Sequence, residues 1–437
     1  MTDALPRLAI IGAGISGIAA AYEARHRARI VMYEAADQPG GHACSIDVDH
    51  GIGLDTGFVV FNRPNYPRLS AFFAELGVET TPHTGEFTFF DHVGGRVYGS
   101  PELESETEPE DPELALIWRE SERFGREGRR DFLRGQADMP LREYLDTHGY
   151  ARSFQDGYIV RLSTAVWSAP FDLIWDMPAA TVIAYFLAHG NSSLGGRGVG
   201  WETVTGGSRR YVDAAIAAIR PDLRLATPVS AVAEDADGVT VTTAAGDVER
   251  FDAVVVATHG DTARGILATP TDGQRQALAD IRYSTSRMVL HTDTSVLPAD
   301  RARWTSWNYG DAEGADGPVP YVAWYLNKLQ GFESATDYVV TLDYAGEIGP
   351  EHVIADHRVQ HPIIDLPLRQ LQKEIHRLTT SDRVALAGSY FHSSDLGWDV
   401  IGSHEAGFTS GTRAARTLLA ARTAAAPAAA PSDAVPA

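Results

Sequence analysis

The residues with the clearest chemical meaning are three glycines and a glutamate near the N-terminus. Gly12, Gly14 and Gly17 follow the apolar run 8–11, and Glu34 ends a second apolar run twenty residues after Gly14. In a G-x-G-x-x-G pattern the first glycine permits a tight turn, the second lets a pyrophosphate approach the backbone, and the third allows close packing of a helix on a strand. An acid at this distance accepts hydrogen bonds from an adenosine ribose, and its charge disfavours a 2′-phosphate. The spacing therefore predicts a dinucleotide site that disfavours NADP.

A strand–turn–helix–strand unit must hold these four residues. The sequence predicts a buried strand over 8–11, a helix over 18–25 and a second strand over 30–33. The helix N-terminus then offers free N–H groups and the positive end of its dipole to the phosphates. A glycine-rich turn that binds nothing is the alternative, and the acid at the expected distance argues against it.

The residues after Glu34 separate FAD from NAD. Residues 40–42 (Gly-Gly-His) resemble the extension found in flavoproteins with two dinucleotide-binding motifs, where a second glycine pair meets the cofactor. The segments 252–258 and 384–388 look like the strands by which such proteins return to the cofactor. A helix expected over about 408–421 would direct its N-terminus at the flavin.

Five further segments carry a broader resemblance. They resemble the bacterial NAD/FAD-binding proteins of the flavin-containing amine oxidase superfamily, at 55–67, 165–181, 201–212, 288–298 and 304–309. The resemblance implies FAD and a two-domain, amine-oxidase-like fold. It does not imply an amine substrate, because members of that group are often associated with modification of lipid acyl chains. The segments 402–407 and 327–330 depart from the usual family pattern.

We predict an α/β fold class, with a Rossmann-like FAD-binding domain that has a mixed sheet and with an α+β substrate domain. The cofactor motifs lie at both ends and in the middle of the chain, so the FAD-binding domain is expected to be discontinuous. The predicted boundaries are 1–70, 205–270 and 382–422 for the FAD-binding domain, 71–204 and 271–381 for the substrate domain, and 423–437 for a disordered Ala/Pro-rich tail.

The resemblance also suggests which residues contact the cofactor. The turn at Gly57 and Phe58 is expected to pass beside the flavin, and the backbone of Val229 is expected to touch the adenine. The full set expected to bind FAD non-covalently is Gly12, Gly14, Ile15, Ser16, Gly17, Glu34, Ala35, Gly40, Gly41, His42, Gly57, Phe58, Val229, Gly388, Glu405, Ala406, Gly407 and Phe408.

Flavin chemistry requires little from the protein beyond positioning the substrate and excluding water. His291 is the candidate acid or base, because we align its predicted strand with the one that carries a flavin-facing lysine in amine oxidases. A hydrogen-bonded structural histidine is the alternative. The aromatic residues that could line the substrate pocket, or pack in the core, are Trp304, Trp307, Tyr309, Trp324 and Tyr325. No metal-ligand spacing is present, so we expect no metal.

Composition narrows the class of protein. The net charge of -21 argues against nucleic acid and anionic membrane surfaces as partners. No apolar run reaches 18 residues and no signal peptide is recognised, so we expect no integral membrane segment. The single cysteine, Cys44, excludes an intramolecular disulfide and fits a reducing cytoplasm. The sequence says nothing of the oligomeric state.

The functional hypothesis from sequence is an FAD-dependent oxidoreductase that acts on a largely apolar small molecule or acyl-type substrate. The aromatic-rich second domain and the acyl-chain association of the resembling group favour this substrate class. Three alternatives stay open: a flavin-dependent double-bond isomerase with no net redox change, an amine oxidase, and a non-catalytic FAD-binding partner protein.

Overall fold

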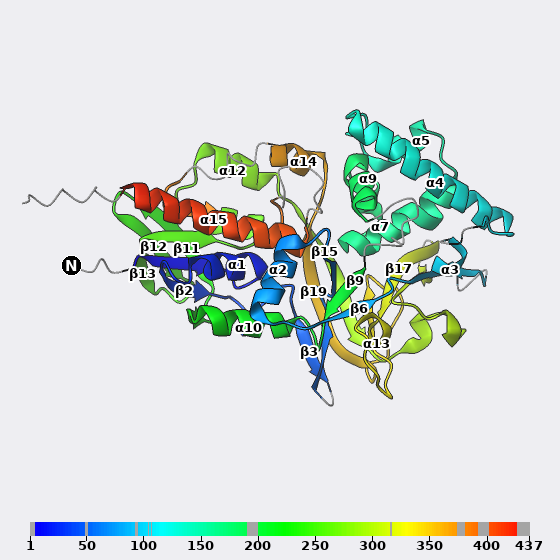
Figure 1. The fold of residues 1–437 in the computed structure, drawn as a ribbon, viewed down its shortest axis with the longest axis horizontal. Coiled ribbons are helices and arrows are strands. Elements are labelled where there is room, and N and C mark those ends of the chain that lie inside the picture. Colours follow the sequence, from blue (N-terminus) through cyan, green and yellow to red (C-terminus); the bar gives the residue numbers. More distant parts are fainter. Residues whose placement is uncertain are drawn as a thin grey trace, which may run out of the picture.

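The computed structural model of the protein describes residues 5–48, 51–91, 95–103, 105, 107–189, 200–314, 317–373, 381–391 and 402–425. Its helices and strands form two lobes (Figure 1). The first and last parts of the chain lie together in the lobe on the left of the figure, and a group of helices from the middle of the chain forms the far end of the other.

A parallel sheet forms the centre of the first lobe. Its strands are β1 (Arg7–Ile11), β2 (Arg29–Tyr33), β10 (Asp222–Arg224), β14 (Ala253–Val256) and β20 (Val384–Leu386). Their order is β10-β2-β1-β14-β20, and every neighbouring pair is parallel. Nearly all side chains of β1, β2, β14 and β20 are buried, as expected for a parallel sheet covered on both faces. The strands predicted from four distant segments are therefore confirmed as neighbours in one sheet.

Four helices pack against one another on one face of this sheet. They are α1 (Ile15–Ala24), α2 (Pro67–Leu76), α10 (Arg209–Ile219) and α15 (His404–Ala425). Helix α1 contacts α10 and α15, and α2 contacts α10 and α15. Helix α15 starts four residues before its predicted start at Phe408 and continues into the first three residues of the tail that we expected to be disordered. Residues 426–437 of that tail lie outside the described residues.

The antiparallel strands of the first lobe form a sheet of their own. They are β11 (Val229–Asp235), β12 (Gly238–Thr243) and β13 (Val248–Phe251), paired in sequence order. The lobe therefore holds a parallel sheet and a separate antiparallel sheet, where the sequence predicted one mixed sheet.

A seven-stranded sheet organises the second lobe. Its strands are β7 (Phe87–Phe90), β8 (Val97–Gly99), β15 (Tyr283–His291), β16 (Trp307–Gly314), β17 (Gly317–Tyr325), β18 (Val339–Leu342) and β19 (Val353–Pro362). Their order is β19-β15-β18-β17-β16-β7-β8, and only β16 and β7 run parallel. This mixture of sheet and helices confirms the predicted α+β character.

Helices from residues 100–188 pack beside this sheet on the right of Figure 1. They are α3 (Ser100–Leu103), α4 (Pro112–Leu133), α5 (Leu141–Thr147), α6 (Arg152–Phe154), a π-helical turn (Gln155–Ile159), α7 (Val160–Trp167), α8 (Phe171–Ile174) and α9 (Ala179–Ala188). Helix α9 packs against α4 and α5, and α7 packs against β17. The helices thereby form one wall over the sheet.

The remaining elements are short and include a small three-stranded sheet. They are β3 (Ser45–Val48), β4 (Ile52–Asp55), β5 (Val60–Asn62), β6 (Thr80–His83), β9 (Trp201–Val204), α11 (Gly260–Ile266), α12 (Asp272–Ala279), α13 (Leu326–Leu329) and α14 (Leu366–Lys373), with short 3₁₀ turns at Thr294–Val296 and Arg301–Arg303. Strand β5 pairs with β9, and β9 pairs with β6. This small sheet joins segments that the sequence assigned to different domains, so the exact domain boundaries stay a prediction.

In the described part of the chain, no helix is both long enough and apolar enough to cross a membrane.

Candidate functional site

One cavity of about 680 Å³ runs from the glycine-rich turn to the seven-stranded sheet. Its wall includes most of the residues expected to bind FAD and three of the five aromatic residues expected at the substrate. The expected cofactor residues in the wall are Gly12, Gly14, Ile15, Ser16, Glu34, Ala35, Gly40, Gly41, His42, Gly57, Phe58 and Gly388. The structure therefore brings a predicted cofactor region and a predicted substrate region into one continuous space.

The glycine-rich turn has the geometry that a pyrophosphate requires. Gly12 has φ +98°, and a Cβ there would lie 2.5 Å from the Ala257 carbonyl oxygen. At Gly14 a Cβ would meet nothing closer than 3.9 Å, so this position leaves the backbone open to a ligand. Helix α1 starts with no side-chain cap and no acid in its first turn. Its first N–H groups and its dipole are thus directed at the cavity and favour an anion.

Gly17 has a different task from the other two glycines, because it does not line the cavity. A Cβ on Gly17 would lie 1.9 Å from the carbonyl oxygen of Gly12. The absent side chain lets α1 pack onto the turn that holds the phosphates, as the sequence pattern predicts.

Glu34 lies at the end of β2 with its carboxylate fixed by the backbone. One oxygen accepts from the Ala13 N–H at 2.8 Å and the other accepts from the Ala36 N–H at 2.9 Å. A carboxylate held in this way at the cavity wall can still accept ribose hydroxyls, because each oxygen has a second lone pair.

The second glycine pair adjoins the first turn. Gly14 and Gly40 form an isolated parallel bridge, and a Cβ on Gly41 would lie 3.2 Å from the Gly14 Cα. Gly57 approaches the same segment, since a Cβ there would lie 2.1 Å from the His42 carbonyl oxygen. That oxygen accepts from the Phe58 N–H at 2.7 Å. Three segments predicted to meet the cofactor therefore meet one another at this wall.

The C-terminal helix reaches the cavity through residues other than those predicted. Glu405, Ala406, Gly407 and Phe408 are absent from the wall, and the residues that line it are Gly402, Ser403 and His404. The prediction placed the helix start four residues too late, so its candidate contacts lie inside the helix. The expectation that the N-terminus of α15 borders the cofactor region is retained.

The four displaced residues have structural partners. The Glu405 carboxylate accepts from the N–H groups of Arg68 at 3.1 Å and Leu69 at 2.9 Å, in the first turn of α2. A Cβ on Gly407 would lie 2.8 Å from the Ile15 side chain, so this glycine allows α15 to approach α1. Phe408 packs against Phe72, with ring centroids 4.9 Å apart.

Val229 begins β11 and does not line the cavity either. The nearest backbone link from its segment to the predicted ribose site is the Thr227 N–H, which donates to the Glu34 carbonyl oxygen at 2.8 Å. A contact between Val229 and the adenine stays a prediction.

His291 lies away from the cavity. Met288 of the same strand lines the cavity, and side chains three positions apart in a strand point to opposite faces. His291 is fully buried beside Asp293 and His352, and burial lowers its pKa to about 4. We therefore do not retain His291 as the acid or base, because the sequence could not show which face of the strand it occupies.

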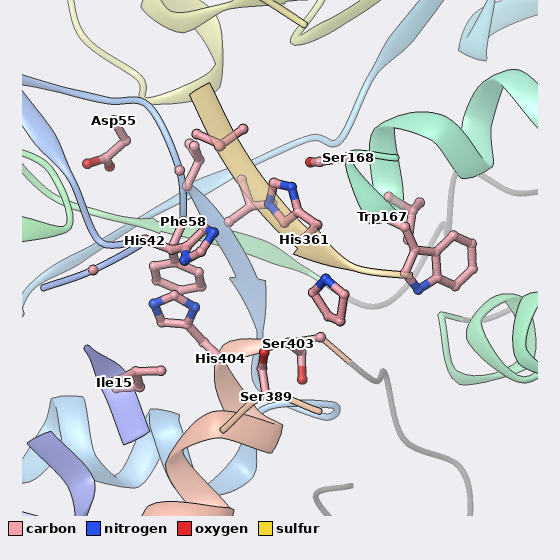
Figure 2. A pocket seen from close by; sticks show the side chains of 18 of the residues that line it. Ile15, His42, Asp55, Phe58, Trp167, Ser168, His361, Ser389, Ser403 and His404 are labelled. Carbon is pink, nitrogen blue, oxygen red and sulfur yellow. The ribbon is translucent and has the colours of Figure 1, made fainter. Parts of the chain in front are cut away.

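A group of histidines lies in the wall instead, and of these the sequence analysis singled out only His42. The ring of His42 lies 5.1 Å from that of His361 and 5.8 Å from that of His259, and the His404 ring stacks on Phe58 at 3.8 Å (Figure 2). Burial is the main cause that lowers the pKa values, to about 4 for His42 and about 3 for His361 and His404. All are neutral near pH 7. Among the described residues no group of histidine, cysteine or acidic side chains has the geometry of a metal site.

Asp55 is the second acid in the wall, and its carboxylate already accepts hydrogen bonds from the protein. Its carboxylate accepts from the Ser45 hydroxyl at 2.5 Å, from the Ser208 hydroxyl at 2.7 Å and from the Gln330 amide at 3.3 Å. Burial nevertheless raises its pKa to about 6. These contacts connect β4, α10 and the segment after α13, so Asp55 joins the two lobes beside the cavity.

The substrate end of the cavity has aromatic walls. Trp307 and Tyr309 lie on the same face of β16, and Trp324 of the neighbouring strand β17 is directly paired with Trp307. Trp304 and Tyr325 do not line the cavity: the Trp304 indole donates to the Pro298 carbonyl oxygen at 2.7 Å, and Tyr325 donates to Asp337 at 2.7 Å. The wall also contains aromatic residues that the sequence analysis missed, namely Tyr66, Phe87, Trp167, Tyr185, Phe186, Trp201, Tyr283 and Tyr390.

The chain is similar in sequence to known proteins. The sequence model of the flavin containing amine oxidoreductases matches residues 15–324. A relative from Paenarthrobacter nicotinovorans, (S)-6-hydroxynicotine oxidase, is 28% identical over 284 residues, which is 61% of this chain and 63% of that enzyme. The match therefore spans less than two thirds of the relative's length.

Solved structures share the fold. Putrescine oxidase bound to putrescine has a TM-score of 0.69 at 14% identity, covering 95% of this chain and 99% of that one. Cyclohexylamine oxidase from Brevibacterium oxydans has a TM-score of 0.68 at 16% identity, covering 96% of this chain and all of the other. These matches confirm the amine-oxidase-like fold. FAD, which the open glycine turn and the placed Glu34 fit, is the cofactor that this family uses.

Proposed function

We propose that this chain, which belongs to the family of flavin-containing amine oxidoreductases, oxidises an amine carried on an aromatic or otherwise apolar scaffold. When bound, FAD supplies the two-electron acceptor for a hydride from the carbon next to nitrogen. The observation that supports the scaffold class is the aromatic wall formed by the sheet and by helices α7 and α9. The family match and the hydroxynicotine oxidase relative favour this amine alternative over the acyl-type substrate that the sequence placed first.

The charge of the cavity supports an uncharged substrate. Among the described lining residues there is no arginine or lysine, and the acids are Glu34 and Asp55. Both carboxylates have backbone or hydroxyl donors, and the lining histidines are neutral because burial lowers their pKa values. Transfer of an ammonium ion into this space costs free energy, because both carboxylates of the wall already accept hydrogen bonds from groups of the protein. The site therefore favours the neutral amine, whose nitrogen lone pair is available to stabilise the oxidised carbon.

A site that binds only the neutral amine predicts how the dissociation constant of the amine depends on pH. No lining histidine is basic enough to remove the proton of an alkylammonium ion, so the substrate must lose it before binding. The dissociation constant should rise about tenfold for each pH unit below the pKa of the amine. Two amines of different basicity should therefore have pH profiles displaced by the difference in their own pKa values.

The test is anaerobic reduction of the flavin in the purified holoprotein. A benzyl-type secondary amine should bleach the visible absorbance of the flavin, whereas putrescine and an unsaturated fatty acid should bleach it far more slowly. Trp307→Leu should weaken amine binding because it removes part of the wall. Trp304→Leu is the matched control, because Trp304 lies outside the wall. Bleaching by the fatty acid alone would overturn the proposal.

We also propose that the FAD is non-covalent. Acid precipitation should release all of the yellow colour into the supernatant, and colour retained on the precipitated chain would contradict this.

A further inference from the structure

Two buried side chains at the helical side of the cavity each have one ring nitrogen without a hydrogen-bond partner in the described part of the chain. Trp167 ends α7 and is 7% exposed, and His189 caps the C-terminus of α9 and is 4% exposed. Both line the cavity. Among the described residues, the Trp167 indole Nε1 and the His189 imidazole Nε2 have no hydrogen-bond partner. Folded proteins rarely leave buried polar groups unpaired, so these two atoms need an explanation.

The hydrogen bonds of His189 define what each atom offers. Its Nδ1 lies 2.7 Å from the Tyr185 carbonyl oxygen, and a carbonyl only accepts, so Nδ1 bears the proton. Burial lowers the pKa of the ring to about 4, so the imidazole is neutral near pH 7. The Nε2 atom is then a bare acceptor, whereas the Trp167 Nε1–H can only donate. Among the described residues at its helical side, the cavity therefore presents one unused donor, on Trp167, and one unused acceptor, on His189.

Neighbouring rings restrict how these two groups can turn. The His189 ring stacks on Tyr185 at 3.9 Å and on Trp201 at 5.3 Å. The Trp167 ring lies 5.3 Å from Tyr185, so Tyr185 touches both. A ring held on two sides is not free to swing toward another partner in the protein.

The chain contains a second tyrosine–histidine pair with the same local arrangement as Tyr185 and His189. In that second pair the histidine Nε2 has a partner, so the arrangement alone does not leave Nε2 unpaired. Tyr144 and His148 have the same spacing, with a 2.8 Å contact from His148 Nδ1 to the Tyr144 carbonyl oxygen and a ring distance of 4.2 Å. In that copy Nε2 lies 3.2 Å from the Asp131 carboxylate. The unpaired state of His189 Nε2 is therefore specific to its position at the cavity.

We propose that Trp167 and His189 form a subsite that binds a group able to accept one hydrogen bond and donate another, such as a hydroxyl or a secondary amide on the substrate scaffold. Trp167 donates to its oxygen and His189 accepts from its O–H or N–H. Figure 2 places Trp167 across the cavity from Phe58, His42 and His404. The subsite thus recognises the scaffold end remote from the predicted cofactor wall. The inference rests on the proposed function for the identity of the substrate, but the binding chemistry does not depend on amine oxidation.

The test uses two ligands without an amine, so that its outcome is independent of turnover. Binding of para-ethylphenol and of ethylbenzene to the holoprotein is measured by calorimetry. The phenol should bind more tightly by about tenfold for each hydrogen bond formed. Trp167→Phe and His189→Phe should each reduce this preference about tenfold, and His189→Gln, which keeps an acceptor near the same place, should restore part of it.

Matched controls separate the subsite from general effects on the fold. Trp304→Phe removes an indole that is already paired to the Pro298 carbonyl oxygen, and His148→Phe removes the second copy of the tyrosine–histidine contact. Both should keep the wild-type preference for the phenol. Equal binding of the two ligands to wild type, or a preference that persists in Trp167→Phe and His189→Phe with full flavin content, would overturn the subsite and indicate a water-filled corner only. Failure of every amine to reduce the flavin would instead overturn the proposed function alone.

Discussion

Gly17→Ala tests whether the phosphate turn depends on close packing. The added Cβ would lie 1.9 Å from the Gly12 carbonyl oxygen, and real Cβ atoms essentially never come within 3.0 Å of a neighbour. The backbone must therefore separate by at least about 1.1 Å at a turn that α1 and β1 hold on both sides. Overpacking of this kind costs about 1–3 kcal/mol, and the same movement displaces the N–H groups that face the phosphates.

The assay for Gly17→Ala is flavin retention during dialysis together with urea unfolding of the apoprotein. We expect flavin loss and a lower unfolding free energy. Gly265→Ala is the control, because Gly265 also lies in a helix and a Cβ there would meet nothing within 4 Å. That control should be neutral or slightly stabilising. Wild-type stability and flavin content in Gly17→Ala would refute the argument.

Three further predictions follow from the buried groups. Glu34→Ala should weaken FAD by about 1.5–3 kcal/mol in a flavin titration, because charge-assisted bonds to the ribose are lost; unchanged affinity would exclude Glu34 as the ribose ligand. Glu405→Gln should lower the unfolding free energy by about 1–3 kcal/mol and leave the flavin spectrum unchanged, because Glu405 holds the N–H groups that start α2; a shifted spectrum would return Glu405 to the cofactor site. The apoprotein should lose stability in urea as the pH falls from about 6.5 to 4, by about 1.4 kcal/mol per pH unit for each histidine, since the unfolded chain binds protons there that the folded chain does not. The histidines concerned have pKa values lowered to about 3–4 and are His42, His83, His189, His291, His361 and His404. Asp55, with its raised pKa of about 6, opposes this trend and offsets about one histidine, and a flat stability profile would contradict the burial of these rings.

The cofactor turn could be predicted because each of its requirements is local. Gly12 needs a positive φ, Gly17 needs no side chain, and Glu34 ends the next strand, so spacing along the chain is enough. The aromatic pair Trp307 and Trp324 could also be predicted as pocket residues, because both lie on strands rich in aromatic residues.

The errors come from facts that the chain does not reveal locally. His291 was assigned to the cavity although Met288, three residues earlier, occupies the lining face of that strand. The strand register also places His361 on the same face of the sheet as Met288. His361 pairs with Ser284, and Ser284 lies four residues before Met288 on the same face of β15. Trp167 and His189 reach the cavity only because α7 and α9 pack over the sheet. A repeated tyrosine–histidine spacing, as at 144–148 and 185–189, was the one sequence signal that could have indicated them.

The most direct test of the central claim is isotopic. Deuterium is placed on the carbon next to nitrogen in a benzyl-type secondary amine, and the rate of anaerobic flavin reduction is measured at saturating amine. Amine oxidation in this cavity predicts that the deuterated amine reduces the flavin several-fold more slowly, with the Trp304→Leu variant behaving as wild type. Flavin reduction that is equally fast with both amines, or that requires no amine, would contradict the account.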